Sequence, residues 1–455
     1  MVKKRVLKIT PVLITLNILI IIIICSFYLF RLVKYYRLEN VSKPGEKIVL
    51  VDQLIKKQSY LDLTKGLVYD ENKNTYTYIG SVDDNYVSYS GMLFRIISID
   101  KNKNIKMISE DVVTMMYSGL EKGYNDSFVN SWLNSSEVKY SGVFENNLYD
   151  KEKYLVKSDV CIDSIDDLSN ITCDEVNSEY NVTLLSLSDY KNAGGKNSYL
   201  NNGTSFYLSS LNSNNENYYL LESGEISLNQ SNSKVTGVRA VITIKGDNVI
   251  LSGNGSYDEP YVFEKHEVNK LADAYVGNYV NIGEDLYKIV DVKNDKVKVA
   301  LSGVLKENEE DFSIEFSKTT NKYGIDTIIG KYLNEDYYKL ISDKVNIIKS
   351  DYPVGEIVLS DLDYRKVFDE VSNVNIGMLT FGDMYVNDCK NVFTLSRGLE
   401  DENIINVLNE DGNVYADYNY NKYNVRPAMY LDGNTEIISG IGSEHGPYQL
   451  GVSNE

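Results

Sequence analysis

Two stretches decide the fold class: VRAVITIKGDNVILSGNGSYDEPY at 238–261 and VRPAMYLDGNTEIISGIGSEHGPY at 425–448. They align without a gap, and both run from V-R to an S-G-x-G-S ending followed by P-Y. Three further pairs of blocks keep the same order along the chain: 85–99 with 278–292, 132–134 with 332–334, and 184–190 with 378–384. A repeat at nearly constant spacing predicts that residues 69–265 and 266–455 are two copies of one module.

Each module is predicted to be a β-rich α+β unit, because short alternating segments are separated by Asn, Asp, Gly and Ser turns. The first copy is expected to open with three consecutive strands, at 75–81, 85–100 and 105–113. The stretch 85–100 is apolar enough to be a central strand buried on both faces. Trp132, the only tryptophan, is expected to anchor the core. Gly246 and Gly433 are expected at positive φ in a tight hairpin after each V-R strand.

The N-terminal segment is predicted to be a membrane anchor. Ile9 to Phe30 contains 22 residues and no charge, and a helix of that length, ~33 Å, crosses a hydrocarbon core of ~30 Å. A cleaved signal peptide would have a shorter apolar core and a small-residue cleavage site. The short basic head before the span favours a single-pass protein with a cytoplasmic N-terminus and an extracellular body. Residues 1–38 therefore form the head and anchor.

Residues 39–68 are predicted to form a stalk or linker. Ile48, Val51, Leu54 and Ile55 recur at helical spacing. The short amphipathic helix that they define either holds the body away from the membrane or packs on the first module. Dimerisation through this helix is a further alternative.

The charge is distributed unevenly along the chain. The net charge is −19, yet residues 1–38 hold seven basic side chains and no acidic one. The rest of the chain therefore has 39 basic and 65 acidic side chains. So acidic a body is repelled by nucleic acid, which excludes that class of partner.

Cysteine is scarce, with only four residues in 455, so packing rather than a disulfide framework must hold the body. A single disulfide between Cys161 and Cys173 is possible in an extracellular body. The loop that these cysteines bracket is acidic, and Asp163, Asp166 and Asp167 are candidate oxygen ligands for calcium. Their spacing is not that of an EF-hand, and a solvated loop is the alternative.

Two charged positions recur in both copies: Asp189 with Asp383, and Arg239 with Arg426. We interpret them as a structural contact between arginine and carboxylate rather than as a ligand site. No zinc, nucleotide or nucleophile motif is present, and two histidines are too few for a His-rich metal site. The sequence therefore predicts no catalytic residue and no cofactor other than the possible calcium.

The motifs GLVYD, YTYIGS, LFRIISID, LLSLSDY and VRPAMYL, with the G-x-G-S…P-Y tail, resemble a family of membrane-anchored bacterial proteins built on a domain of unknown function. The resemblance covers nearly all of 66–455 in two copies, and it carries no known chemistry. The first copy departs from the pattern with VRAV at 238–241, and the aromatic strand is reduced to FYLSS and FTLSR. Such endings are weakly similar to C-type-lectin-like folds.

The sequence thus predicts a membrane-anchored extracellular protein that binds a glycan, cell-wall or protein ligand, or builds surface structure. A surface rich in Tyr and Asn suits such recognition. The alternative from another class is a cell-envelope hydrolase that uses paired carboxylates. A scaffold or sensor whose partner binds the membrane helix or the stalk is a third possibility.

Overall fold

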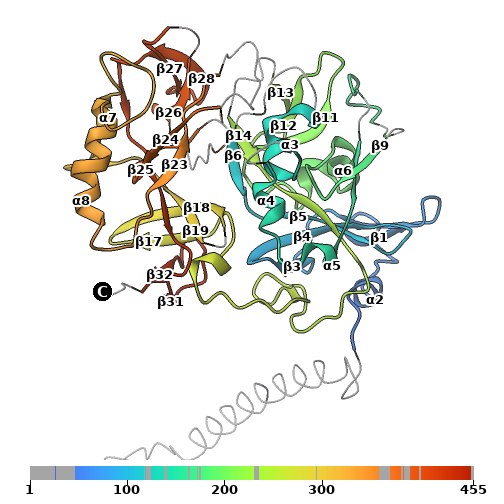
Figure 1. The fold of residues 1–455 in the computed structure, drawn as a ribbon. Coiled ribbons are helices and arrows are strands. Elements are labelled where there is room, and N and C mark those ends of the chain that lie inside the picture. The colour runs from blue at the N-terminus through green and yellow to red at the C-terminus, as the bar shows by residue number, and fades with distance from the viewer. Residues whose placement is uncertain are drawn as a thin grey trace, which may run out of the picture. The chain divides into compact units, whose positions relative to one another are not determined.

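The computed structural model describes Ser26 and residues 47–451, except 117, 119–123, 138–140, 162–163, 172, 174–175, 230–234, 294, 358–368, 381–382, 384–389 and 399–400. The predicted membrane segment Ile9–Phe30 lies outside these residues apart from Ser26. No helix in the part of the chain that is described has the length and apolar character needed to span a bilayer. The chain divides into two units, 1–49 and 50–455, and the fold below is that of the second (Figure 1).

The first half of this unit, residues 66–262, is built on a nine-stranded sheet. Its main path runs β1-β2-β4-β5-β15-β10, and β3 pairs with β4 on one side and with β16 on the other. β7 pairs with β15. The strands are β1 (Gly66–Asp70), β2 (Thr75–Ile79), β3 (Tyr86–Tyr89), β4 (Met92–Ile99), β5 (Ile105–Ser109), β7 (Leu155–Val156), β10 (Val182–Thr183), β15 (Val241–Ile244) and β16 (Tyr261–Val262).

The second half, residues 270–450, is built on a seven-stranded sheet in the order β25-β30-β19-β18-β17-β32-β31. Its core gathers buried aliphatic and tyrosine side chains from the sheet and from the helix beside it. The strands are β17 (Tyr279–Ile282), β18 (Asp285–Val292), β19 (Lys296–Leu301), β25 (Ile376–Gly377), β30 (Ala428–Asp432), β31 (Ile437–Ser439) and β32 (Tyr448–Leu450).

Six strands follow the same order in the two sheets. The series β10-β15-β5-β4-β3-β16 in the first half matches β25-β30-β19-β18-β17-β32 in the second. The registers match as well, since Tyr261 pairs with Val87 and Tyr448 pairs with Val280, in both cases between parallel strands. All other neighbours in the two series are antiparallel.

Each half also carries a five-stranded sheet, in the order β13-β12-β11-β14-β6 or β28-β27-β26-β29-β22. In both sheets the middle strand, β11 or β26, runs parallel to β14 or β29. Its antiparallel pairing with β12 or β27 is irregular in register. The strands are β6 (Thr114–Met116), β11 (Phe206–Leu211), β12 (Asn217–Leu220), β13 (Ile226–Asn229), β14 (Thr236–Val238), β22 (Ser313–Glu315), β26 (Val392–Arg397), β27 (Ile404–Leu408), β28 (Val414–Tyr418) and β29 (Lys422–Asn424).

Three two-stranded ribbons complete the β structure. They are β8 (Ser158–Cys161) with β9 (Val176–Tyr180), β20 (Lys306–Glu307) with β21 (Glu310–Asp311), and β23 (Ser350–Pro353) with β24 (Val371–Val374). The α-helices are α2 (Leu50–Ile55), α3 (Phe128–Leu133), α4 (Val143–Asn146), α5 (Lys151–Tyr154), α6 (Leu187–Asn192), α7 (Ile328–Lys331) and α8 (Tyr338–Ile341), with the π-helix η4 (Tyr332–Tyr337) between the last two. This content confirms the β-rich α+β class.

The same asparagine fixes a helix to the sheet in each half. The Asn134 side chain donates to the carbonyl of Val182 (2.7 Å) and accepts from its amide (3.0 Å). The Asn334 side chain does the same with Ile376, at 2.9 and 3.0 Å. In each case the backbone of one strand residue, Val182 or Ile376, binds both the NH₂ group and the carbonyl oxygen of the asparagine side chain. Each helix is therefore held at a defined position on the short strand β10 or β25. Trp132 is buried against Phe144, as predicted.

Two details of the predicted strands are wrong. Residues 85–100 form a hairpin rather than one strand, because Ser90 and Gly91 both adopt positive φ, as in the turns that join antiparallel strands tightly. Only its second arm, β4, is the predicted central strand.

Neither Gly246 nor Gly433 has a positive φ, and the segment after β15 or β30 does not pair back on that strand. Gly246 is instead required by close packing, since an added Cβ would lie 1.8 Å from the carbonyl oxygen of Lys103.

The positive φ values fall in the shared G-x-G tail. Gly253 and Gly440 have φ values of 89° and 96°, and a Cβ on either would collide with the carbonyl of the proline seven residues later. These glycines turn the chain so that the final strand can lie beside β3 or β17.

The stalk helix packs on the body. In α2, Leu50, Val51 and Leu54 are buried, and the amides of Leu50 and Val51 donate to the carbonyls of Asn248 and Gly246 at 2.8 and 3.1 Å. Of the two arrangements predicted for this helix, the structure has the one in which it packs on the first half.

Candidate functional site

The repeated aspartates do not contact the repeated arginines. Asp189 lies in the first turn of α6, where the Ser186 hydroxyl caps the helix, and its carboxylate pairs with Lys106 of β5 at 3.2 Å. Asp383 pairs in the same way with Lys298 of β19 at 2.6 Å. The predicted contact between arginine and these carboxylates is therefore wrong. The sequence could not identify Lys106 as the partner, because that residue comes from a strand 83 residues earlier.

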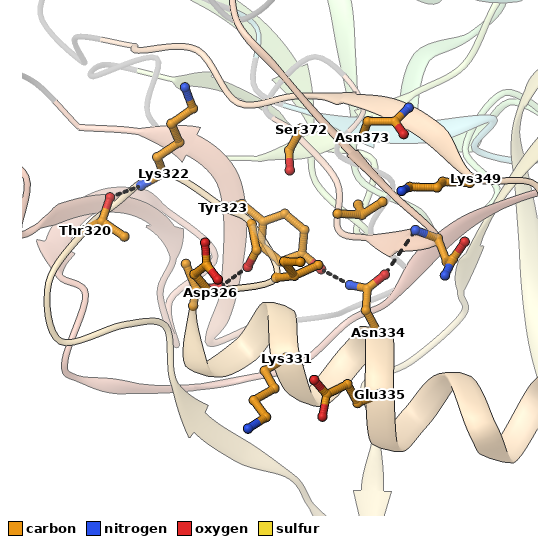
Figure 2. A pocket seen from close by; sticks show the side chains of 15 residues that line it. Thr320, Lys322, Tyr323, Asp326, Lys331, Asn334, Glu335, Lys349, Ser372 and Asn373 are labelled. Atoms are coloured by element: carbon orange, nitrogen blue, oxygen red, sulfur yellow. Dashed lines mark hydrogen bonds between the residues drawn. The ribbon is translucent and has the colours of Figure 1, made fainter.

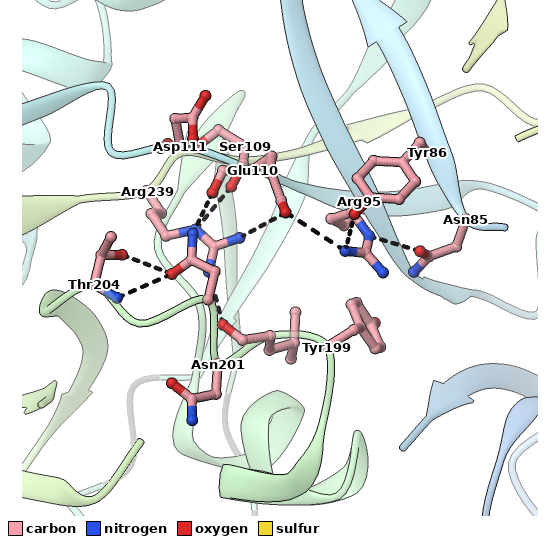
Figure 3. Close-up of polar contacts among 12 residues, drawn as sticks. Asn85, Tyr86, Arg95, Ser109, Glu110, Asp111, Tyr199, Asn201, Thr204 and Arg239 are labelled. Carbon is pink, nitrogen blue, oxygen red and sulfur yellow. Dashed lines mark hydrogen bonds and ion pairs between the residues drawn. The ribbon is translucent and has the colours of Figure 1, made fainter. Parts of the chain in front are cut away.

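Arg239 is buried in the first half and faces a different carboxylate, that of Glu110 (Figure 3). Its Nη2 atom lies 3.6 Å from Glu110, and its Nε and Nη1 donate to the carbonyls of Ser109 and Leu200 at 2.8 and 2.7 Å. Arg95 approaches the other oxygen of Glu110, also at 3.6 Å. Burial lowers the pKa of Arg239 to about 10, and Glu110 opposes that shift. One carboxylate thus serves two guanidinium groups.

The second half has no carboxylate at the equivalent position. Arg426 donates through Nε to the carbonyl of Leu301 at 2.7 Å, as Arg239 does to Ser109. The residue after Leu301 is Ser302, whose amide donates to Leu286, just as the Glu110 amide donates to Leu93. Lys288 takes the place of Arg95 opposite a tyrosine of the neighbouring strand. Burial, followed by the charge of Arg426, lowers the pKa of Lys288 to about 8.

Arg239 and Arg426 both donate to backbone carbonyl groups in the interior of the fold, so we assign these buried cations to its framework. The guanidinium of Arg239 is fully enclosed, and it joins the end of β5 to the segment that contains Leu200. A ligand could not reach it without opening the core. The candidate site must therefore lie elsewhere.

The second half contains an open polar pocket of about 620 Å³ (Figure 2). One wall is the loop 320–327 with the first turns of the helix that begins at Ile328. The opposite wall is strand β24 with the residues that follow it, including Ser372, Asn373 and Asn375. Lys349, just before β23, completes the lining.

The floor of the pocket is rigid. Tyr323 is buried, and its hydroxyl donates to the carbonyl of Ile376 at 2.6 Å. Asn334 donates to the same carbonyl and to the Tyr323 hydroxyl, at 2.9 and 3.2 Å. The helix is capped by Thr327, whose hydroxyl accepts from the Gly330 amide at 3.0 Å. Since each of these groups is fixed by the backbone, the pocket is preformed rather than induced.

The rim is charged and exposed. Lys322, Lys331 and Lys349 line it, together with the carboxylates of Asp326 and Glu335. Lys322 forms an ion pair with Glu370. Once Lys322 is set against Glu370, two lysines and two carboxylates remain, so the pocket is close to neutral although the body as a whole is strongly acidic. Hydroxyls, amides, ammonium groups and carboxylates that converge on one preformed hollow suit a polar ligand, and Lys331 and Lys349 can pair with an acidic group on it.

A tyrosine occupies the equivalent position in the first half. The last residue of β24 is Val374, which pairs with Ser350 and lines the pocket. The last residue of β9 is Tyr180, which pairs with Ser158. The Tyr180 ring packs edge-on against Tyr124 at 5.7 Å, and its hydroxyl donates to Asn125 at 3.0 Å. Tyr180 thus has, in the first half, the register position that the smaller, buried Val374 has in the second.

The structure joins Cys161 and Cys173 by a disulfide. Asp163 lies outside the described residues, and the two neighbouring aspartates have separate partners. Asp166 accepts from the amide and hydroxyl of Ser213, and Asp167 accepts from those of Ser169. Hydrogen bonds from Ser169 lower the pKa of Asp167. Within the described ranges no three metal-binding side chains gather, so calcium stays a prediction.

Apart from Asn334, which belongs to the repeated block 332–334, none of the pocket residues was singled out by the sequence, which pointed to repeated charges instead. Repetition identifies what both halves need for folding, whereas this pocket depends on a difference between them. The one usable signal was the change from Tyr180 to Val374 between otherwise equivalent hairpins. The chain matches no family model, no curated protein and no solved structure.

Proposed function

We propose that this chain is a membrane-tethered extracellular binding protein whose body consists of two copies of one module. The equivalent strand orders and registers of the two halves support the duplication. The uncharged segment Ile9–Phe30 supports the tether. The Cys161–Cys173 disulfide supports an oxidising compartment outside the cytosol. Membership of the bacterial family that the motifs resemble is part of the same proposal.

The ligand site is the pocket of the second half, and the ligand is a polar, negatively charged glycan such as a cell-wall fragment. The observation that carries this proposal is the preformed hollow with two lysines, Lys331 and Lys349, beside amide and hydroxyl groups. Ammonium groups pair with carboxylate or phosphate on the ligand, and amides and hydroxyls exchange hydrogen bonds with sugar hydroxyls. The first half, whose equivalent position holds Tyr180, serves as framework.

The sharpest test is Val374→Tyr, which gives the second half the side chain of the first. We expect the full-length protein to bind glycans and cell-wall fragments in a calorimetric screen and the variant to lose at least about tenfold in affinity. The control is Val371→Tyr, on the same strand but away from the pocket. Equal binding by wild type and Val374→Tyr would place the ligand elsewhere.

Charge is tested separately with Lys331→Ala and Lys349→Ala. Each should weaken binding of an acidic fragment more than that of its neutral analogue, because each removes one ammonium partner. Lys339→Ala is the matched control, since Lys339 is exposed on α8 and does not line the pocket.

The hydrolase alternative keeps one specific observation in its favour, because Asp326 and Glu335 line the same pocket. An inverting or retaining glycosidase needs two carboxyl groups across the scissile bond. Release of reducing ends from cell-wall glycan by the wild type, lost in both Asp326→Asn and Glu335→Gln, would favour the enzyme. Binding without product release favours the binding protein.

A further inference from the structure

The loop between α2 and β1, residues 59–64, displays apolar side chains to solvent. Leu61 is fully exposed, and Tyr60 and Leu63 are 76% and 62% exposed. Three large apolar groups exposed within four residues are uncommon on a soluble protein and favour a contact with a partner or a membrane. In Figure 1 this loop belongs to the blue part of the chain, beside α2 and β1.

The loop is held in its conformation by its own hydrogen bonds. The Ser59 amide donates to the carbonyl of Leu67 at 2.7 Å, and the Ser59 hydroxyl donates to the carbonyl of Asp62 at 2.6 Å. The Asp62 carboxylate accepts from the amide and hydroxyl of Thr64 at 2.9 and 2.6 Å. Because the backbone is fixed in this way, the exposure of the leucines is built into the loop and is not a consequence of fraying.

Tyrosines extend the apolar face toward the adjacent hairpin. The rings of Tyr69 on β1 and Tyr76 on β2 lie 4.6 Å apart. β1 is the last strand on its side of the sheet, and the segment just before the loop bridges it there, through Gln58 and Leu67. Tyrosine is enriched at the boundary between lipid headgroups and water, where its ring and its hydroxyl meet different environments.

Charge indicates which partner covers this face. Residues 31–65 hold eight basic and four acidic side chains, whereas residues 66–455 hold 34 basic and 61 acidic ones. Lys56 and Lys65 flank the loop and are exposed. The acidic body is repelled by an anionic bilayer, whereas the basic composition of residues 31–65 favours attraction to such a bilayer. Tyr60 also follows Phe30, the end of the apolar segment, by only 30 residues.

We propose that the 59–64 loop inserts Leu61 and Leu63 into the interface of the bilayer that holds the N-terminal segment. The loop is then a second membrane contact, which fixes the orientation of the body and of its pocket. This inference rests on the proposed membrane attachment. It commits to lipid as the occupant, because the flanking charge matches anionic headgroups and the leucines match the acyl boundary.

The test uses the full-length chain in vesicles of phosphatidylcholine and phosphatidylglycerol that contain brominated lipid. Leu61→Trp places a fluorescent reporter in the loop, and Ile441→Trp places one at another exposed apolar residue, which lies in the second half and is 76% exposed. Trp132, the only native tryptophan, is buried and supplies a constant background. We expect the lipid bromines to quench the Leu61→Trp signal several-fold more strongly than the Ile441→Trp signal.

Equal quenching of the two reporters in chains that sediment with the vesicles would overturn the loop contact and leave the tether intact. Failure to sediment would overturn both proposals together. A third outcome is that the Leu61→Trp reporter is shielded from aqueous acrylamide but is not quenched by the brominated lipid. This result would assign the loop to a contact with a second copy of the chain and would contradict the inference. Leu61→Ser with Leu63→Ser provides a second arm, in which we expect the body to become more accessible to soluble protease while the tether holds.

Discussion

In the first half, the hairpin β8–β9 is closed by the Cys161–Cys173 disulfide, whereas the equivalent hairpin β23–β24 of the second half is closed by charge. There the Arg397 guanidinium donates to Glu370 at 3.0 Å and to the carbonyl of Val354 at 2.8 Å, and Lys322 also pairs with Glu370. The two hairpins meet their five-stranded sheets in the same way, through the parallel bridges Ser164–Leu211 and Glu356–Arg397. The same backbone is thus fixed covalently in one half and electrostatically in the other.

The difference extends to the core and the pocket. The first half balances its buried guanidinium groups with Glu110 and fills its pocket position with Tyr180. The second half has Ser302 and Val374 at those positions, so it retains an unusual buried lysine and an open hollow. The two halves therefore differ in the charge and in the side-chain volume that they place at equivalent positions.

The largest effect is expected from Glu110→Ser, which gives the first half the residue found in the second. Removing one partner of a buried ion pair typically costs about 3–5 kcal/mol, because the remaining charge stays buried. Here two guanidinium groups, Arg95 and Arg239, lose their shared carboxylate. Calorimetry should show the transition of the first half shifting to lower temperature. A shift below 1 °C would contradict the structural role that we give to Glu110.

The next effect is loss of the disulfide in Cys161→Ser with Cys173→Ser. A cross-link between residues 12 apart stabilises the folded state by about 3 kcal/mol, chiefly by restricting the unfolded chain. Chemical unfolding with and without reductant should give this difference in the wild type and none in the double variant. If reductant leaves the wild type unchanged, the closure of the two hairpins does not differ as described.

The reverse exchange, Ser302→Glu, is expected to stabilise the second half by about 1 kcal/mol, because it adds a carboxylate near Lys288 and Arg426 to the charges of Asp111 and Glu444 that already favour the charged lysine. It also has a pH signature. The folded pKa of Lys288 is about 8 against an ordinary lysine value of 10.5, so the unfolded state binds more protons between these values and stability rises with pH there. Below pH 8 both states are charged and the slope vanishes.

Ser302→Glu should reduce this rise by about 1 kcal/mol, because one pKa unit corresponds to about 1.36 kcal/mol. The comparison with the wild type at pH 8 to 9.5 isolates Lys288, because the buried tyrosines are the same in both proteins. A stability difference that does not change over this interval would contradict the assignment.

The smallest effect is expected from Arg397→Ala, about 1 kcal/mol or less, because Glu370 and Lys322 are substantially exposed. The hydrogen bond from Lys322, and then the charge of Arg397, lower the pKa of Glu370 below 4.5. A lowered carboxylate pKa stabilises the fold above the unfolded value, and that contribution is lost as the pH falls through the folded value. The cost of Arg397→Ala should therefore shrink below pH 4.5, whereas the disulfide contribution should not. Hydrogen exchange on β23 and β24 gives the local measurement.

The fold class could be predicted because repetition and turn chemistry are local properties of the sequence. The matched stretches 238–261 and 425–448 indicate equivalent tails, and the structure gives them equivalent places in the two sheets. The hairpin at Ser90 and Gly91 was missed because the apolar pattern continues across the turn. Length and periodicity do not distinguish one long strand from two short ones in such a segment.

The site could not be predicted, because its geometry depends on side chains that meet only in the folded state. Asp189 was paired with the wrong cation, since nothing in the local sequence shows that Lys106 faces α6. The prediction for the pocket depends on the size of one residue at the end of β24. Val374 differs from its counterpart Tyr180, so a search for identical residues in the two halves does not select it. Where two copies exist, the positions at which they differ in volume or charge are the informative ones.

The parallel pairing of the tail strands has a consequence for biosynthesis. β16 completes the sheet by lying beside β3, and Tyr261 meets Val87 across 174 residues of chain; β32 meets β17 after a similar interval. Since such distant contacts form late, neither half can finish folding until its final strand has left the ribosome. A chain that remains incomplete for so long is suited to export before it folds, and a product truncated before Tyr448 would expose β17 as an unprotected edge prone to aggregation.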